Sequence, residues 1–427
     1  MIIWINNPFD NLPIEGFRPQ RYWLMAQAFA RAGHEVVLWT SDWSHALKRP
    51  RVMTDDQIAT AGRQIGQDAR LILIETPPYR AHVSLTRIRS HRVYAKRWLS
   101  EGVRLVTKGL LSKPDLVIAS TPPLSSGIVA QTFREHWDCK VVVDIQDSWP
   151  ETFFRTLPLP SGLQRKWGPF FFAPLLRVAR RLYTGADAVT GVARKYLELA
   201  REYGVKAPTR LCYHGISLQP NFAGSGPAAK MLPFNGQRNI SLVYLGNMGR
   251  SYDLATVIRG VRETPGVELH LAGTGPEEGN FRLEAHSSPR IFFHGYLRDS
   301  AVRTLLASAD AGVIPMFNDS CVGVPYKLAD YAAAALPVIN SLDGETAELI
   351  SHYGTGVQYT AGNLASFKKA LGGLIAASAH LPEMRLHMLD MVRHEFDAVP
   401  IYDSYVRFCE SLFPPPHPDG KPEPEEQ

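Results

Sequence analysis

Clustered cysteines are missing from this sequence. The four cysteines are widely separated along 427 residues, at Cys139, Cys212, Cys321 and Cys409, and none forms a C-x-x-C pair. Cysteine-based metal sites need clustered ligands, and disulfide frameworks are typical of small secreted chains. The sequence therefore predicts free thiols in a protein that works in a reducing compartment.

Long apolar runs are missing as well. No stretch reaches the roughly 18 consecutive apolar residues that a membrane-spanning helix needs. The first residues, MIIWINNPFD, lack the basic region of a secretory signal and lead straight into a predicted strand. We therefore expect a cytoplasmic protein, with peripheral attachment to the inner face of the cell membrane left open.

A third absence concerns the loop after the first expected strand. Residues 6–19 are rich in Asn, Pro and Gly but contain no G-x-G-x-x-G. That pattern is the fingerprint of dinucleotide-binding oxidoreductases, so its absence argues against this class. Gly16 in this loop either allows a ligand to come close to the backbone or is an ordinary turn glycine.

Charge is distributed unevenly along the chain. The net charge is +5, but residues 1–222 hold 30 Lys and Arg against 18 Asp and Glu, whereas residues 223–427 hold 16 against 23. A chain of this length predicts two or three domains. One basic and one acidic half suggest domains with different partners, and an anionic surface for the first. No nucleic-acid partner is predicted.

Short apolar runs alternate with helical segments in both halves. Strands are expected at 1–5, 35–40, 70–75, 116–120, 141–145 and 188–192, and again at 240–245, 267–272, 291–293, 311–315 and 337–340. Such alternation predicts an α/β protein with doubly wound parallel sheets. The expected domains are residues 1–222 and 239–395, joined by a linker at 220–238. A helix at 396–413 is expected to return to the first domain, and residues 414–427 form a disordered tail.

The most informative stretch is residues 308–342, SADAGVIPMFNDSCVGVPYKLADYAAAALPVINSL. Its pattern predicts a strand, a polar loop, a helix from Tyr326 and a second strand. Lys327 and Asp330 then share a helix face, close to the unpaired N–H groups and positive dipole of the helix N-terminus. These features favour a phosphate beside Lys327, with sugar hydroxyls donating hydrogen bonds to Asp330 one turn deeper. A solvated Lys–Asp pair is the competing interpretation.

The segment VGVPYKLADYAAAALPVIN resembles the nucleotide-sugar helix of GT-B glycosyltransferases of family 4. More narrowly, it resembles the branch that adds amino sugars to bacterial surface polysaccharides, including the WbuB-type N-acetyl-fucosamine transferases. Four further blocks precede it in the expected order: RPQRYWLMAQAFARAGHEVVLWTSDWSH, VVVDIQDSWPE, LVYLGNMGRSYDLATVI and LAGTGPE. The resemblance covers most of residues 1–413. It implies a GT-B fold, in which two Rossmann-like domains face a central cleft.

The resemblance places a nucleotide sugar mainly on the second domain. Lys327 and Arg250 would neutralise the diphosphate, because Asn247 stands near the usual family Arg and Ser251 or Tyr252 near the usual Lys. Arg250 could equally be a surface arginine. The implied donor-binding residues are Gly16, Gly246, Gly249, Arg250, Gly273, Gly275, Pro276, Tyr296, Val324, Lys327, Leu328 and Asp330.

The sequence departs from the family at one further position. The paired glutamates of the family, eight positions apart, fall on Val322 and Asp330. Asp330 keeps the ribose-binding role by resemblance, whereas Val322 lacks the carboxylate that the family places near the sugar. The nearby polar candidates are Asn318, Asp319 and Ser320.

The acceptor side is expected on the first domain. Asp147 follows the strand at 141–145 and is the candidate for orienting or deprotonating the acceptor hydroxyl, although a turn or N-cap aspartate has the same pattern. Arg18 and Arg21 could meet a phosphate of the acceptor. Residues 153–181 interleave aromatic and basic residues, which is typical of an element that lies on anionic lipid or of a core helix with a charged outer face.

Together with the resemblance, these features predict a glycosyltransferase with Asp147, Lys327 and Arg250 in catalytic roles; the resemblance alone implies that it retains the anomeric configuration. It would take a UDP-sugar, an N-acetylated hexosamine or its deoxy form, and a polyprenyl-diphosphate-linked saccharide acceptor, in the synthesis of lipopolysaccharide or capsule. No cofactor is predicted, and no metal, since no D-x-D motif stands beside the donor residues. Two alternatives remain. A UDP-GlcNAc 2-epimerase shares the fold, but the basic aromatic segment argues against it; an inactive scaffold protein is favoured by Val322.

Overall fold

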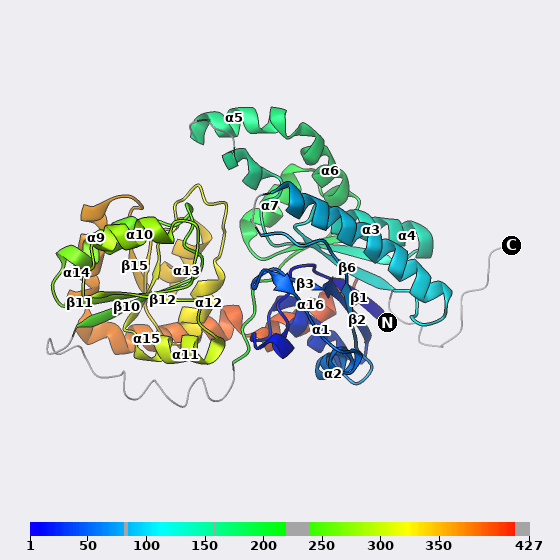
Figure 1. Ribbon diagram of the computed structural model, residues 1–427, viewed down its shortest axis with the longest axis horizontal. Helices are drawn as coiled ribbons and strands as arrows, with labels where there is room; N and C mark the ends of the chain where they lie inside the picture. The colour runs from blue at the N-terminus through cyan, green and yellow to red at the C-terminus, as the bar shows by residue number, and fades with distance from the viewer. Residues whose placement is uncertain (81–83, 157–158, 160, 219–238, 415–427) are drawn as a thin grey trace.

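The computed structural model describes residues 1–80, 84–156, 159, 161–218 and 239–414. Two parallel sheets, each covered by helices, form two lobes (Figure 1). The fold is therefore the predicted α/β arrangement. The expected linker at 220–238 lies outside the described residues. The expected tail lies outside them as well, except for its first residue, 414.

The first lobe is built on a seven-stranded sheet in the order β5-β2-β1-β6-β7-β8-β9. Its strands run almost entirely buried, as the near-continuous Val, Ile and Leu runs of a parallel sheet require. They are β1 (Ile2–Asn6), β2 (Glu35–Ser41), β5 (Arg70–Ile74), β6 (Leu116–Thr121), β7 (Lys140–Ile145), β8 (Ala188–Gly191) and β9 (Thr209–Leu211). The helices of this lobe are α1 (Arg21–Arg31), α2 (Asp55–Ile65), α3 (Leu85–Thr107), α4 (Leu124–Trp137), α5 (Ser161–Phe171), α6 (Ala173–Thr184) and α7 (Arg194–Glu202).

The second lobe repeats the design with six parallel strands in the order β12-β11-β10-β13-β14-β15. They are β10 (Ile240–Leu245), β11 (Val267–Ala272), β12 (Ile291–Gly295), β13 (Ala311–Ile314), β14 (Val338–Asn340) and β15 (Gly356–Gln358). The helices are α9 (Leu254–Glu263), α10 (Glu278–Ala285), α11 (Asp299–Ser308), α12 (Tyr326–Ala333), α13 (Glu345–Tyr353), α14 (Leu364–Ala376) and α15 (Leu381–Met391).

The strand order reverses once in each sheet. In the first lobe the reversal lies between β1 and β6, and in the second between β10 and β13. Ligands of open α/β sheets bind outside the carboxyl ends of the strands at such a switch point. The loops after β1 and β10, and the loop between β13 and α12, are therefore the places to look for a site.

The chain returns to the first lobe at its end. After a π-helical turn (Val392–Phe396), helix α16 (Ala398–Glu410) packs against α1, and its residues Tyr402, Tyr405 and Cys409 belong to the core that also holds β1 and β2. The backbone of Ile216 bonds to both Phe396 (2.7 Å) and Ala398 (3.0 Å), which joins this crossing to the end of the first lobe.

The predicted strands are all present, with ends shifted by at most two residues. Three features were missed: the edge strands β9 and β15 and a short hairpin of β3 (Trp43–Ser44) and β4 (Arg49–Pro50). These strands are two or three residues long, and β9, β15 and β4 are not fully buried. They therefore lack the continuous apolar run that marks a buried strand.

Candidate functional site

Helix α12 carries the residues that the sequence singled out. Pro325 caps it with extended backbone, so the helix begins at Tyr326 and places Lys327 in its first turn. Lys327 is only 8% exposed, and its Nζ lies 4.1 Å from the centre of the Tyr244 ring and 4.3 Å from that of Tyr252. Among the described residues, Nζ has no hydrogen-bond partner. Burial lowers the pKa of Lys327 to about 7, against the opposing effect of Asp330.

Two glycine-containing loops lie next to this ammonium group. Gly246 has a left-handed φ of 135°, and a Cβ there would lie 3.4 Å from Nζ of Lys327. Gly273 also has a positive φ, and a Cβ there would come within 1.9 Å of the Gly246 carbonyl oxygen. A Cβ on Gly275 would meet the Met248 carbonyl oxygen at 2.4 Å. Side chains are thus excluded at Gly273 and Gly275 by close backbone packing, while Gly246 leaves its backbone beside Lys327.

Asp330 turns toward the first lobe. The residue is 8% exposed, and its carboxylate forms an ion pair and a hydrogen bond with Arg18 of the loop after β1. The Arg18 guanidinium also stacks on Tyr326, 4.9 Å from the ring centre. Asp330 therefore lies at the junction of the two lobes, with Lys327 and Asp330 on the same short helix.

A pocket of about 360 Å³ opens beside this ion pair. The first lobe contributes residues 16–19 and 216–217, and the second contributes the start of α11; the lining residues are Gly16, Phe17, Arg18, Pro19, Ile216, Ser217, Arg298, Asp299, Ser300 and Arg303. Both lobes shape this pocket. Gly16 is an exposed turn glycine with φ 85°, and Tyr296, more than half exposed, stands before the same helix.

Asp147 lies on the first lobe after β7. Its Oδ1 accepts a hydrogen bond from the Ser148 N–H at 2.8 Å and one from the Thr152 hydroxyl at 3.4 Å. Asp147 therefore also stabilises the local turn, as the alternative interpretation of the sequence expected. Burial raises its pKa above the ordinary value, although Lys195 and Arg87 act in the opposite direction. A buried carboxyl whose pKa is raised above the ordinary value is suited to proton transfer.

Lys195, at the start of α7, was missed by the sequence analysis. Its Nζ donates to the Val322 carbonyl at 3.1 Å, and the next residue, Tyr196, donates through its hydroxyl to the Cys321 carbonyl at 3.3 Å. The loop before α12 is thus held against the first lobe, close to Asp147. A lysine at a helix start gives no sequence signal that it faces another domain; only the packing shows it.

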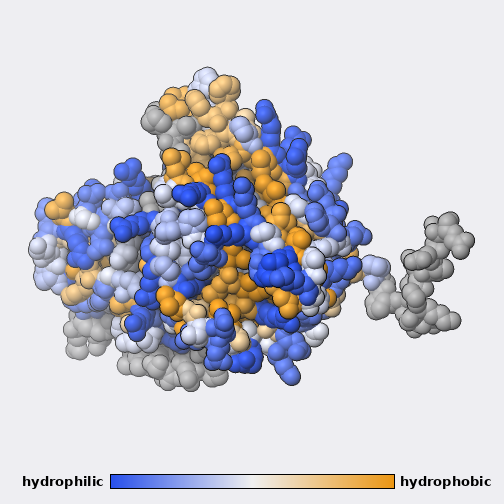
Figure 2. All heavy atoms as spheres, turned by 45° about the vertical axis from the view of Figure 1, so that its right-hand side comes forward, coloured by the Kyte–Doolittle hydropathy of each residue, from blue (hydrophilic) through white to orange (hydrophobic). Residues whose placement is uncertain are grey.

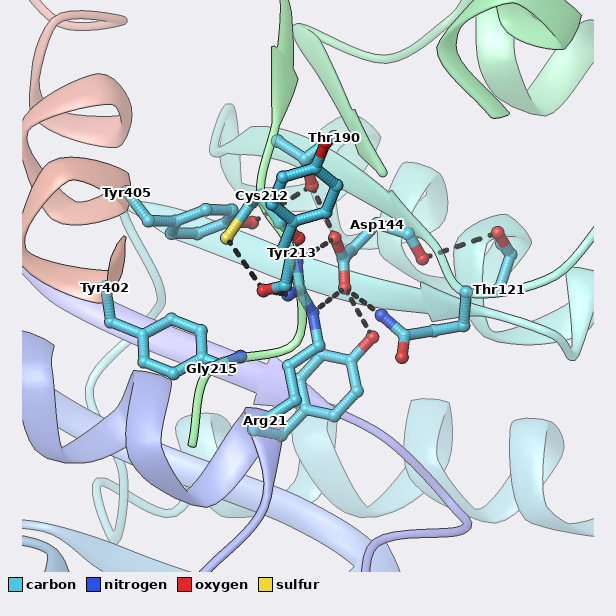
Figure 3. A network of polar contacts seen from close by, with 11 residues as sticks. Arg21, Thr121, Asp144, Thr190, Cys212, Tyr213, Gly215, Tyr402 and Tyr405 are labelled. Carbon is cyan, nitrogen blue, oxygen red and sulfur yellow. Dashed lines mark hydrogen bonds and ion pairs between the residues drawn. The ribbon is translucent and has the colours of Figure 1, made fainter. Parts of the chain in front are cut away.

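The structure corrects the prediction for Arg21. This residue is 2% exposed and donates to both carboxylate oxygens of Asp144, at 2.9 and 2.8 Å (Figure 3). The Tyr22 and Thr190 hydroxyls also donate to Asp144. Burial alone would raise the pKa of Asp144, but Arg21 and these hydrogen bonds hold it below its ordinary value. Arg21 is therefore buried in an internal network and is not placed to meet an acceptor.

The remaining predicted residues divide into exposed and buried groups. Arg250 has a 91% exposed side chain that pairs with Glu277 at 3.0 Å, so the structure does not bring it to the buried Lys327. Gly249 lies beside it, and Pro276 is exposed on the next loop. Val324, just before α12, and Leu328, within it, are buried in the hydrophobic core and are not placed to contact a ligand.

The polar candidates around Val322 behave differently from one another. Asn318 is engaged with Asp343, to which it donates at 2.5 Å, whereas Asp319 is exposed. Ser320 is buried, and within the described part of the chain its hydroxyl has no partner. Ser320 is thus the candidate whose polar group is still available for a ligand.

Helices α5 and α6 present apolar side chains to solvent. Phe170 is 73% exposed, Phe171 57% and Trp167 46%, and Figure 2 shows hydrophobic residues gathered at this end of the molecule. The exposed cations on the same two helices are Lys166, Arg177, Arg180 and Arg181. In the described ranges, no helix combines the length and apolar character needed to cross a bilayer.

Family models match both lobes. Residues 20–213 match the description "Glycosyl transferase 4-like domain", and residues 239–377 match "Glycosyl transferases group 1". No curated protein matches the sequence.

Solved structures show the same two-lobed fold. A sucrose-phosphate synthase from Thermosynechococcus elongatus superposes with a TM-score of 0.72 at 16% identity, covering 96% of this chain and 98% of that one. HepE from Anabaena, in complex with UDP, gives 0.63 at 14% identity, with 96% and 99% covered. The lipopolysaccharide outer core galactosyltransferase WaaB gives 0.60 at 13% identity, also with 96% and 99% covered. At these identities the likeness concerns the fold.

Proposed function

Because the chain is a group 1 glycosyltransferase of the GT-B type, we propose that it moves a sugar from UDP to a polyprenyl-diphosphate-linked saccharide. The donor sugar is an N-acetylated hexosamine or deoxyhexosamine, and the reaction belongs to surface polysaccharide synthesis. Retention of the anomeric configuration is part of the proposal.

The observation that carries this function is the buried ammonium of Lys327, which lies over two tyrosine rings but has no hydrogen-bond acceptor in the described part of the chain. A buried lysine without a hydrogen-bond acceptor is costly, and that cost is relieved when an anion enters. Nζ stands at the first turn of α12 and beside the Gly246 backbone, where helix N–H groups also favour negative charge. A diphosphate at this point would supply the acceptor that the lysine lacks.

The other roles follow from the position of the diphosphate. Asp330, one turn along α12, would accept hydrogen bonds from ribose hydroxyls. To do so, its carboxylate would have to release part of its contact with Arg18. Asp147 would orient or deprotonate the acceptor hydroxyl from the first lobe. Ser320 and the loop held by Lys195 would lie near the donor sugar. Leaving-group stabilisation and positioning are the two largest contributions available to such a site.

The choice of UDP as the nucleotide of the donor is supported by similar folds. HepE has been solved with UDP, with UDP-glucose, and with UDP and glucose, and its fold covers this chain almost completely. The amino-sugar preference rests on the sequence resemblance.

Attachment to the membrane surface is proposed for α5 and α6. Aromatic and aliphatic side chains there are exposed next to several cations. Such a surface gains free energy both from apolar contact with acyl chains and from attraction to anionic headgroups. It would bring the first lobe to an acceptor that is anchored in the same membrane.

The test is a transfer assay with a panel of UDP- and GDP-sugars and extracted lipid-linked saccharides. We expect transfer from one UDP-N-acetylhexosamine or its deoxy form, and none from GDP-sugars. Conversion of UDP-GlcNAc without any acceptor would identify an epimerase instead. Undetectable UDP binding by calorimetry would identify an inactive scaffold.

A further inference from the structure

Aromatic and cationic side chains meet at the carboxyl ends of the first sheet, outside the residues already assigned. They come from the loop after β1, the β3–β4 hairpin, the segment after β5, helix α3 and the loop after β7. We call this the aromatic–cationic cluster, and its members are Phe9, His45, Lys48, Tyr79, Arg87, His91 and Trp149. These five separate segments converge at the edge where α/β sheets bind ligands.

Arg87 is at the centre of the cluster. Its guanidinium lies 5.2 Å from the centre of the Phe9 ring, 5.9 Å from Tyr79 and 5.8 Å from Trp149. The three rings surround this half-buried guanidinium, which loses part of its hydration there. Cation–π contacts offset part of that loss.

Lys48 is a second cation in the same place. Its Nζ lies 5.1 Å from the centre of the Tyr79 ring and 3.4 Å from Nδ1 of His45. Burial and the nearby charge of Arg87 together lower the pKa of Lys48 to about 8. The same two causes lower the pKa of His91 to about 3, so this imidazole is neutral. Two like charges brought together in partial burial create a demand for an anion.

The backbone at Lys48 is also unusual. Its φ is 52°, in the left-handed region that is unfavourable for a residue with a Cβ. Glycine or asparagine is the residue that such a hairpin position ordinarily takes. Strained non-glycine residues concentrate where the side chain has a function. The hairpin thus carries a lysine where backbone conformation alone favours glycine.

Asp147 adjoins the cluster. The charge of Arg87 acts to lower the pKa of Asp147, and the charge of Asp147 acts to raise the pKa of Arg87. Trp149, two residues along, lies 6.1 Å from His91 between ring centres. A ligand in the cluster would therefore lie beside the candidate base.

We propose that the aromatic–cationic cluster binds the phosphate-bearing end of the acceptor, with Lys48 and Arg87 at the phosphate oxygens and the partly exposed ring of Trp149 against the adjoining sugar. The proposal rests on the proposed function and deepens it. It also replaces Arg21 as the contact for that phosphate, since Arg21 is buried with Asp144. A charged phosphate explains the paired cations, and the flat ring of Trp149 suits the C–H face of a pyranose.

The test measures glucose 1-phosphate binding to the protein saturated with UDP, by calorimetry. UDP occupies the donor site, so the probe reports a second anion site. We expect Lys48→Gly and Arg87→Gln each to weaken glucose 1-phosphate binding at least tenfold while UDP affinity stays unchanged. Lys48→Gly suits the left-handed backbone and should fold normally. Arg89→Gln, an exposed residue of the same helix, is the matched control and should change neither affinity.

Three outcomes would overturn the proposal. Glucose 1-phosphate could fail to bind the UDP-loaded wild-type protein, or bind it equally well after both substitutions. A parallel loss of UDP affinity would assign the cluster to the donor site. Failure of the proposed function can be told apart from these outcomes. If the wild-type protein does not bind UDP, the same measurement is made on the free protein. Glucose 1-phosphate binding that is lost in Lys48→Gly then still identifies the cluster as an anion site, and its absence overturns the proposal.

Discussion

Arg18 of the first lobe and Asp330 of the second form an ion pair at the junction of the two lobes. The pair orients the Asp330 carboxylate toward the first lobe and not toward open solvent. It also gives that carboxylate a partner that a bound ribose must share or displace. The Asp330 carboxylate therefore serves both a contact between the lobes and the proposed contact to the nucleoside.

Asp330→Asn should weaken UDP binding about tenfold, because an amide accepts the ribose hydroxyls less strongly than a carboxylate. The same substitution should leave the affinity for 2′,3′-dideoxy-UDP unchanged, since that nucleotide has no hydroxyls to donate. Calorimetry with the two nucleotides measures the difference. An equal loss for both would assign Asp330 to holding the lobes together.

Lys327→Ala should weaken UDP binding tenfold or more, since a charge-assisted contact to phosphate contributes about 1.5–3 kcal/mol. Arg250→Ala is the control, because its exposed side chain pairs with Glu277. If Arg250→Ala has the larger effect, the diphosphate lies on the outer loop and not at Lys327.

The affinity for UDP should also depend on pH through Lys327. Burial sets the pKa of its ammonium to about 7 in the free protein, and a bound diphosphate raises that pKa. UDP binding above pH 7 therefore takes up a proton, and the affinity falls as the pH rises from 7 toward 9. Calorimetry in buffers of different ionisation enthalpy measures the uptake. The uptake should vanish in Lys327→Ala.

Asp147→Asn should lower turnover in the transfer assay by a hundredfold or more, because general base catalysis contributes about 10²–10⁴. UDP affinity should not change, since Asp147 belongs to the first lobe. Normal turnover would leave Asp147 with its turn role alone, in which it accepts from Ser148 and Thr152.

Asp144→Asn should lower the free energy of unfolding by about 3–5 kcal/mol, because it leaves the buried Arg21 without its counter-charge. Urea unfolding followed by circular dichroism measures the change. Asp403→Asn breaks the exposed pair with Arg31 and should cost at most about 1 kcal/mol. Similar costs for the two substitutions would contradict the structural role of the Arg21–Asp144 pair.

Reversing the charges of Lys166, Arg180 and Arg181 to Glu should release the protein from vesicles that contain anionic lipid. Each basic residue near such a surface contributes about 1 kcal/mol. Sedimentation with phosphatidylglycerol vesicles measures binding. Reversal of Arg250, Lys369 and Arg393 on the second lobe is the matched control. If only this control releases the protein, the membrane contact lies on the second lobe.

The sequence by itself determined the two doubly wound sheets, their strands to within two residues except for the missed edge strands β9 and β15, and the place of Lys327 and Asp330 on one helix face. These features follow from local rules: buried parallel strands are continuous apolar runs, and residues three apart share a helix face. Only the tertiary structure decided that Arg21 is buried with Asp144, that Arg18 reaches Asp330, and that Lys48, Arg87 and Trp149 converge. Those partners lie tens to hundreds of residues apart, and a charged residue carries no local signal of what it will face. Burial and pairing are set by how separate segments pack, so they appear only when the chain is folded.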